Sequence, residues 1–187
     1  TTFEEAWEHF VKYKEYVLGI IIDNNFKKYG VRDPEAGLEL AAAVKAEHKD
    51  IPILIQTSDP TIAEKAKRVD ASYLLKNSPR LLHDLRKFMM NNFGFGDFVF
   101  KTSDEHEVAR ASNLKQLAER LKEISDDCLL YHAEGNHFSK WLKARKEFWL
   151  AHQLRPRKVT DFKTIEDLRR DLISSLRNYR KIRQRGI

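Results

Sequence analysis

The chain has 187 residues, 42% hydrophobic and 33% charged, with 34 lysines and arginines against 28 aspartates and glutamates. This length suffices for one ordinary core or two small ones, and the composition excludes a disordered or low-complexity chain. The longest apolar run, Val17–Ile22, is too short to span a bilayer, and the single cysteine, Cys128, cannot form an internal disulfide, so we expect a cytoplasmic protein.

The first half alternates predicted helices with buried strands. Thr2 and Glu5 have the spacing of a capping box that opens a helix. Val17–Ile22 is a run of branched apolar residues without alternation, which predicts a strand covered on both faces, and Ile51–Ile55 and Ser72–Leu75 predict two more. The helices that separate and follow these strands begin at three proline signals, Asp33-Pro34, Asp59-Pro60 and Ser78-Pro79.

Strands that alternate with helices on short connections predict a parallel sheet with right-handed crossovers. In such sheets the chemistry gathers at the carboxyl ends of the strands. Those ends carry an acid, a hydroxyl and an amine, namely Asp23, Thr57 and Lys76. We therefore expect these three side chains to meet at one edge of the sheet.

The order and spacing of these residues resemble the receiver domain of two-component response regulators. The resemblance covers roughly residues 1–92 and implies a flavodoxin-like α/β fold, here a partial parallel sheet of three strands with flanking helices. Four segments carry it: Asp23-Asn24-Asn25-Phe26 is similar to the phosphoacceptor loop, Gly37-Leu38-Glu39-Leu40 to the start of the third helix, Ile53–Ser58 to the fourth strand, and Tyr73-Leu74-Leu75-Lys76 to the fifth.

The resemblance also implies a role for each position. Asp23 would accept a phosphoryl group, with Mg²⁺ held by Asp23 and the backbone carbonyl of Asn25. Lys76 would neutralise charge on the phosphoryl oxygens, and the Thr57 hydroxyl would bond to the bound group. Tyr73 would be the switch aromatic that converts this charge change into a surface change.

The sequence also departs from the receiver pattern. The acidic pair that holds the metal at the end of a receiver's first strand has no counterpart, because the first strand, first helix and second strand are absent. Asn77 follows Lys76 where the family has proline, and a long basic loop runs from Asp23 to Gly37. We expect Mg²⁺ to bind weakly, if at all, and Asp23 is either a phosphoacceptor or the strand-end carboxylate of a pseudo-receiver. The chain reads as a segment of a larger protein.

Without the first two strands, Val17–Ile22 becomes an edge strand. A long apolar edge is a template for pairing with another chain. We expect the edge to be covered through strand pairing, either in a homodimer or by a further N-terminal piece.

From Gly94 onward the pattern changes to a predicted antiparallel hairpin followed by helices. Phe98–Phe100 and Val108–Arg110 form the hairpin, and one helix runs from Phe138 through Trp149 until Pro156 ends it. We divide the chain into a receiver-like α/β domain at 1–93, an α+β accessory module at 94–156, and a basic helix at 157–187 that leads to a further domain.

This succession of segments is similar to large bacterial proteins related to phosphoenolpyruvate synthase and pyruvate phosphate dikinase. The function we predict is a regulatory module of a larger phosphotransfer protein, which contacts the remaining domains or another protein and has no enzymatic activity of its own. One alternative is the N-terminal part of a phosphoenolpyruvate synthase-like ATP-dependent enzyme that contributes to substrate handling.

Two further signals have ordinary explanations. Cys128, His132, His137 and His152 match no standard zinc spacing, so packing is the simpler role. Residues 155–187 hold eleven lysines and arginines against four acidic residues. The second alternative function, nucleic-acid binding through this basic helix, is disfavoured because no base-reading element accompanies it; a solvated helix face explains the charges.

Overall fold

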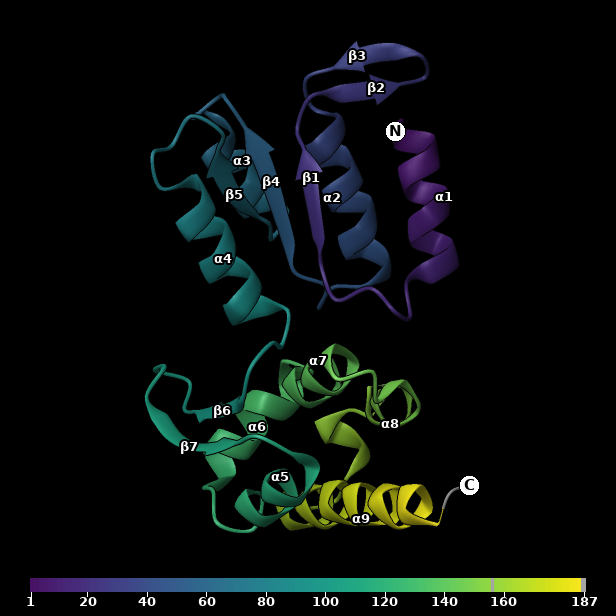
Figure 1. The fold of residues 1–187 in the computed structure, drawn as a ribbon, viewed down its shortest axis with the longest axis vertical. Helices are drawn as coiled ribbons and strands as arrows, with labels where there is room; N and C mark the ends of the chain where they lie inside the picture. The colour runs from purple at the N-terminus through teal and green to yellow at the C-terminus, as the bar shows by residue number, and fades with distance from the viewer. Residues whose placement is uncertain (156, 186–187) are drawn as a thin grey trace. The chain divides into compact units, whose positions relative to one another are not determined.

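The computed structural model describes residues 1–155 and 157–185, and the chain divides into two compact units. The first unit is Thr1–Phe93 and the second begins at Gly94 (Figure 1). Each unit has an apolar core of its own, as an independently folding domain requires.

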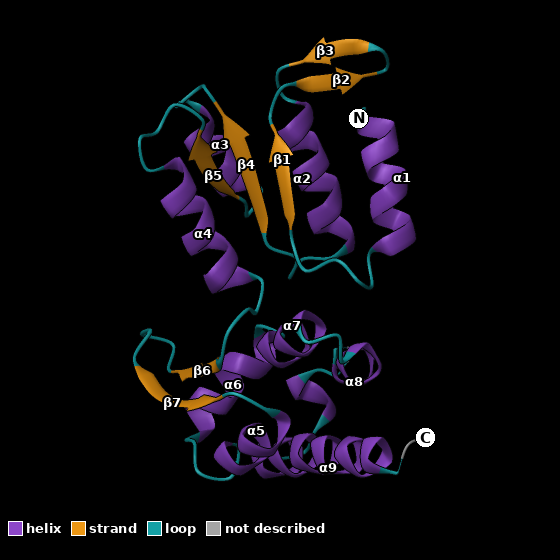
Figure 2. Cartoon of the chain, in the orientation of Figure 1, coloured by secondary structure: helices purple, strands orange, loops and turns teal. Residues whose placement is uncertain are grey.

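The first unit contains a three-stranded parallel sheet in the order β1-β4-β5. Its strands are β1 (Ile20–Asp23), β4 (Ile53–Thr57) and β5 (Ser72–Leu75). In this register Asp23 lies beside Gln56 of the central strand. The predicted parallel sheet of three strands with flanking helices is confirmed (Figure 2).

Four helices flank this sheet, and three of them share its core. Phe10, Val44 and Ile62 belong to one apolar cluster with Ile22 and Ile55 of the strands. Burying these side chains on one face of the sheet supplies most of the stability of this layer. The helices are α1 (Phe3–Tyr13), α2 (Ala36–Glu47), α3 (Ile62–Arg68) and α4 (Leu81–Asn92), and α4 packs against β5.

The predicted basic loop between Asp23 and Gly37 is instead a hairpin of β2 (Phe26–Lys28) and β3 (Val31–Asp33). Tyr29 and Gly30 form its two-residue turn with positive φ angles of 50° and 82°. That pair of left-handed conformations is typical of the type I′ turn, whose twist matches the strands it joins.

The second unit consists of a hairpin and a group of helices. The predicted hairpin is present as β6 (Phe98–Lys101) paired antiparallel with β7 (Glu107–Ala111). The helices that follow are α5 (Leu114–Arg120), α6 (Asp126–Glu134), α7 (His137–Ala144), α8 (Phe148–Leu154), the short 3-10 helix Val159–Asp161 and α9 (Ile165–Gln184).

Two expectations for this unit are corrected. The single helix through Phe138 and Trp149 is two helices, because Lys146 adopts a left-handed conformation (φ 62°) between α7 and α8. The described part of the predicted separate segment, residues 157–185, shares a core with the module before it, because α9 packs into the same core as α5. Pro156, predicted to end a helix, lies outside the described residues.

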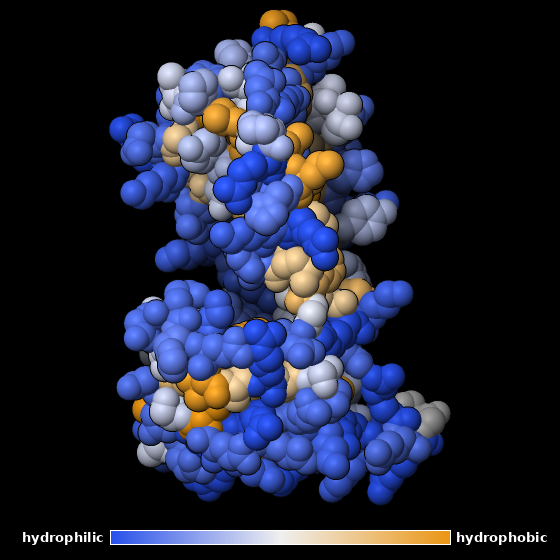
Figure 3. Space-filling view, turned by 60° about the vertical axis from the view of Figure 1, so that its left-hand side comes forward, coloured by the Kyte–Doolittle hydropathy of each residue, from blue (hydrophilic) through white to orange (hydrophobic). Residues whose placement is uncertain are grey.

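The face seen in Figure 3 is mostly hydrophilic, with small apolar patches on both units. None of the helices in residues 1–155 and 157–185 has the length and apolar content needed to cross a membrane. In the described sheet β1 pairs with β4 alone, and the side chain of Ile21 on that strand is 41% exposed. Covering of this edge by a second copy or a further segment stays a prediction.

Candidate functional site

Lys76 and Asp23 form an ion pair at the carboxyl edge of the parallel sheet. Asp23 ends β1 and Lys76 directly follows β5, so the pair spans the end of the central strand. Nζ of Lys76 lies 2.5 Å from Oδ2 of Asp23. Backbone bonds run to β4 from both sides: Lys76 donates to the carbonyl of Thr57 at 2.8 Å, and Asn24 donates to that of Gln56 at 2.9 Å.

The carboxylate of Asp23 lies among hydrogen-bond donors and positive charges. Its Oδ1 accepts the backbone N–H of Asn25 at 3.1 Å, while its Oδ2 accepts from Lys76. Partial burial acts to raise the pKa of Asp23, but the hydrogen bonds from Lys76 and Asn25 and the charges of Lys76 and Arg32 hold it below its usual value. Asp23 is therefore ionised at neutral pH.

Thr57 lies at the end of β4, with only 5% of the residue exposed. Its hydroxyl accepts the backbone N–H of Asp59 at 3.0 Å, in the turn that leads to α3. Among the described hydrogen bonds, none joins this hydroxyl to Asp23 or Lys76. The structure thus brings two of the three predicted side chains into contact, and places the third on the neighbouring strand end with a different partner.

The remaining predicted positions lie on the same sheet. Tyr73 is the second residue of β5 and is 44% exposed, so its ring can change position without opening the core. Asn25 follows the end of β1 and contacts Asp23 through its N–H. The receiver pattern assigns the carbonyl of Asn25 to the metal, but the contact that the structure describes between Asn25 and Asp23 is made by the N–H of Asn25.

The donor set around Asp23 does not fit a Mg²⁺ site. Mg²⁺ requires an octahedron of oxygen ligands. Here one carboxylate already accepts from an ammonium group and an amide, and the charged groups acting on it are the cations Lys76 and Arg32. In residues 1–155 and 157–185 no group of three or more histidine, cysteine or acidic side chains could hold a metal.

Gly37 fixes the position of this strand end against α2. A Cβ atom at Gly37 would lie 2.6 Å from the carbonyl oxygen of Asp23 and 2.7 Å from Cα of Asn24, closer than packed atoms approach. The Asn24 side chain is 4% exposed and donates to the carbonyl of Pro34 at 2.5 Å, which closes the base of the β2–β3 hairpin.

The second unit contains a polar cluster around His132 and His137, two residues for which the sequence analysis expects a packing role. Nδ1 of His132 and Nδ1 of His137 lie 3.0 Å apart, and Nε2 of His132 accepts the backbone N–H of Lys101 at 2.8 Å. Since Nε2 of His132 is an acceptor, the neutral ring carries its hydrogen on Nδ1 and donates it to His137. His137 then carries its own hydrogen on Nε2.

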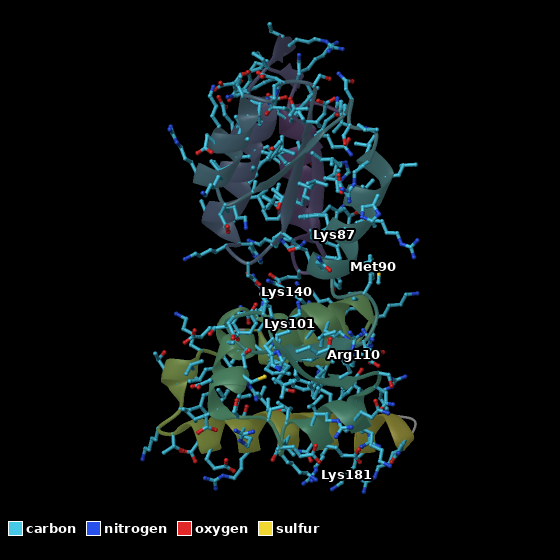
Figure 4. All side chains as sticks on the ribbon, turned by 90° about the vertical axis from the view of Figure 1, so that its left-hand side faces the viewer. Lys87, Met90, Lys101, Arg110, Lys140 and Lys181 are labelled. Carbon is cyan, nitrogen blue, oxygen red and sulfur yellow. The ribbon has the colours of Figure 1, made fainter. Side chains whose placement is uncertain are left out.

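Burial keeps both rings neutral. Desolvation, followed by the charge of its neighbour His137, lowers the pKa of His132 to about 3. Desolvation and the charge of Lys140 lower the pKa of His137 to about 4. The charges of Lys101 on β6 and Lys140 on α7 both act on His137. Figure 4 labels these two lysines on the second unit.

Glu105 completes the cluster from the β6–β7 turn. Its carboxylate accepts the ammonium of Lys101 at 2.8 Å and the hydroxyl of Tyr131 at 3.0 Å. Glu105 itself has a positive φ of 65°, and Asn136, which precedes α7, has one of 53°. These left-handed residues place the turn and the start of α7 around the histidines. Cys128 and His152, the other residues considered for a metal, are not described as partners of this pair.

A family model matches residues 91–185, which is half of the chain. The chain belongs to DUF5752, a family of unknown function. No curated protein and no solved structure matches it. The DUF5752 segment begins near the end of α4 and then follows the second unit, so it includes the histidine pair and excludes Asp23 and Lys76.

The basic residues of the DUF5752 segment are partly used inside its fold. The guanidinium of Arg169 is 9% exposed, pairs with Asp126 at 2.6 Å and with Glu166 at 3.2 Å, and also donates to backbone carbonyls. Arg183, further along α9, pairs with Glu147. These contacts give part of the positive charge a structural role.

Proposed function

We propose that residues 1–93 are a receiver-like regulatory domain of a larger phosphotransfer protein, and that this domain acts by protein contact. The observation that carries the proposal is the Asp23–Lys76 ion pair across the end of β4. It places a carboxylate and an amine at the same edge of a parallel sheet, which is where α/β folds concentrate their function.

The finer fold assignment belongs to this proposal. The strand order β1-β4-β5, with the connections running through α2 and α3, corresponds to the third, fourth and fifth strands of a flavodoxin-like sheet. The hairpin β2–β3 is an insertion in this scheme, placed between the aspartate and the helix that follows it.

Contact is favoured over metal-assisted phosphoryl transfer because the donor set at Asp23 does not fit Mg²⁺. In the contact mode, Lys76 and Asp23 form a fixed link between the outer strands. Tyr73, 44% exposed on β5, contributes to the surface that a partner or the remaining domains contact. Asp23 as a phosphoryl acceptor is the second candidate function, and the lysine beside it favours that role as a charge-neutralising group.

A mass measurement separates the two. The chain is treated with acetyl phosphate and Mg²⁺ and its intact mass is recorded beside that of an Asp23→Asn variant. We expect no added phosphoryl group on either protein. A gain of one phosphoryl group that is lost in Asp23→Asn would overturn the contact-only mode and establish Asp23 as an acceptor.

A further inference from the structure

The β2–β3 hairpin is held firmly against the helices of the first unit. A two-stranded hairpin is marginally stable by itself, so its order depends on such contacts. The N–H of Tyr29 donates to Oε1 of Glu4 in α1 at 2.8 Å, and the ammonium of Lys28 pairs with Glu39 of α2. Lys28 also lies 5.2 Å from the centre of the Phe3 ring. The hairpin thus presents its other face in a fixed geometry.

That outer face carries two like charges directly opposite each other. Lys27 on β2 is the register partner of Arg32 on β3, and both residues are exposed. Neither forms an ion pair within the part of the chain that the structure describes. Like charges at directly opposite positions destabilise a two-stranded sheet. The pair therefore weakens the isolated hairpin, and an anionic group bound between the two side chains would remove the repulsion.

An exposed aromatic side chain flanks this basic pair. Tyr29 is 80% exposed at the turn, whereas Val31, 70% exposed on β3, is the register partner of Lys28 and shares the face of that residue. Apolar atoms reach the surface among hydrophilic ones at the top of Figure 3, where the hairpin lies in Figure 1. A rigid aromatic residue next to cationic residues is a common composition of protein-binding surfaces.

We propose that the outer face of the β2–β3 hairpin binds an acidic protein segment. Carboxylates of the segment contact Lys27 and Arg32, and an apolar side chain of it packs against Tyr29. This inference rests on the proposed function, in which the domain acts by protein contact, and it names the chemistry of the partner.

A protein segment fits this face better than a nucleic acid does. A duplex presents one phosphate charge per about 1.7 Å and needs an extended basic surface. Here the two cations are followed along the chain by the acidic residues Asp33 and Glu35 and preceded by Asp23. A short acidic segment with an apolar residue matches both the small number of charges and the exposed Tyr29.

Fluorescence anisotropy with the full chain tests the proposal. The probe is a labelled twelve-residue peptide of Glu-Glu-Leu repeats, and the same peptide with glutamine in place of glutamate is its neutral counterpart. The double variant Lys27→Glu with Arg32→Glu should bind the acidic peptide about tenfold more weakly at low salt. Lys67→Glu is the control: it reverses an exposed charge near the C-terminal end of α3, outside the hairpin, and should leave binding unchanged.

Thermal unfolding supplies an independent readout on the same proteins. The single variant Lys27→Glu places opposite charges across the hairpin, so its unfolding midpoint should rise while its affinity for the peptide falls. The double variant restores a like-charge pair and also removes the positive charge of Arg32 that acts on Asp23, so its unfolding midpoint should fall below that of Lys27→Glu. A cooperative transition above the assay temperature shows that its lost binding is not a loss of folding. Tyr29→Asn keeps a residue that tolerates positive φ and should also weaken binding.

Three results would overturn the proposal: no binding of the acidic peptide, equal binding of the glutamine peptide, or equal binding of duplex DNA with no effect of Tyr29→Asn. The assay contains no phosphoryl donor, so its failure leaves the acetyl phosphate result unaffected. Conversely, phosphorylation of Asp23 would overturn the contact-only mode without altering peptide affinity measured in the absence of donor.

Discussion

Lys76 reaches Asp23 across the end of β4, so a single ion pair joins the two outer strands of the parallel sheet. Both side chains are partly exposed, at 36% and 47%, and solvent screening therefore limits what the pair contributes to stability. Its larger effect is on the ionisation of Asp23, whose pKa it lowers. The same contact thus fixes the position of the two side chains and keeps Asp23 ionised.

Replacement of Lys76 by methionine should lower the free energy of unfolding by about 0.2–1 kcal/mol and return the Asp23 pKa toward its ordinary value. In the wild type, the stability from this lowered pKa is present above the unfolded-state pKa and is lost as the pH falls through the folded-state pKa. The variant should lose less stability on acidification. Urea unfolding at pH 7 and pH 3, with an NMR titration of Asp23, measures both effects, and Lys67→Met is the matched control.

The histidine pair predicts that the second unit loses stability on acidification at a higher pH than the Asp23–Lys76 pair does. His132 and His137 have folded-state pKa values of about 3 and about 4 against an ordinary value of 6.5, so the unfolded chain binds more protons than the folded chain in this range. Their contribution is complete above pH 6.5 and is lost as the pH falls toward 4 and 3. Each histidine contributes a slope of up to about 1.4 kcal/mol per pH unit.

Urea unfolding between pH 4 and 7 measures this slope. The groups that face the pair include Lys101, Glu105, Tyr131 and Lys140, and the charge of Glu105 opposes the lowering of the pKa at both histidines. The double variant His132→Gln with His137→Gln should flatten the curve, whereas replacement of the exposed His106 should not. An unchanged slope in the double variant would show that the histidines titrate alike in both states.

Cys128 offers a probe of unfolding in the same unit. It has no exposed surface, and burial raises the pKa of its thiol. Thiolate is the reactive form, so an aromatic disulfide reagent at pH 8 should modify the folded chain only as fast as the unit opens. Reaction should be rapid and stoichiometric in 6 M guanidinium. Rapid modification of the native chain would contradict the buried placement of this side chain.

The elements that sequence analysis predicts correctly are those with a strong local signal. Continuous apolar runs fix the three parallel strands, and the capping box of Thr2 and Glu5 forms as expected, with the Thr2 hydroxyl accepting from Glu5 at 3.3 Å. The ends of these strands follow directly, which is why the contact between Asp23 and Lys76, 53 residues apart, is predictable. The order of the parallel strands then predicts which strand ends lie close together in space.

The features it misses depend on partners that are distant or on single backbone angles. The strands of the β2–β3 hairpin are three residues each, rich in charge, and are held by contacts such as that of Tyr29 with Glu4, 25 residues away. Only Gly30 in the turn signals it locally. His132 and His137 meet because Asn136 adopts a left-handed conformation between two helices, which a helical periodicity cannot show. The hydroxyl of Thr57 bonds to its own turn, as threonine at a strand end often does.

Gly135 gives a direct test of the histidine geometry. Its φ of −79° is ordinary for any residue, so alanine there meets no backbone penalty. An added Cβ would nevertheless lie 2.4 Å from Nε2 and 2.6 Å from Cε1 of His137, so the ring would have to shift from its place in the cluster. We expect Gly135→Ala to destabilise the chain by about 1–3 kcal/mol, as overpacking of a filled site does.

A double-mutant cycle separates this clash from other effects of the methyl group. His137→Ala removes the ring and its bond to His132. In that background Gly135→Ala should destabilise the chain little or even stabilise it, because the space for the methyl group is then open. At a helix end of ordinary φ, glycine is also less favourable than alanine, since it loses more conformational entropy on folding. Urea unfolding of the four proteins at pH 7 gives the coupling free energy. Additive effects would mean that His137 does not pack against Gly135.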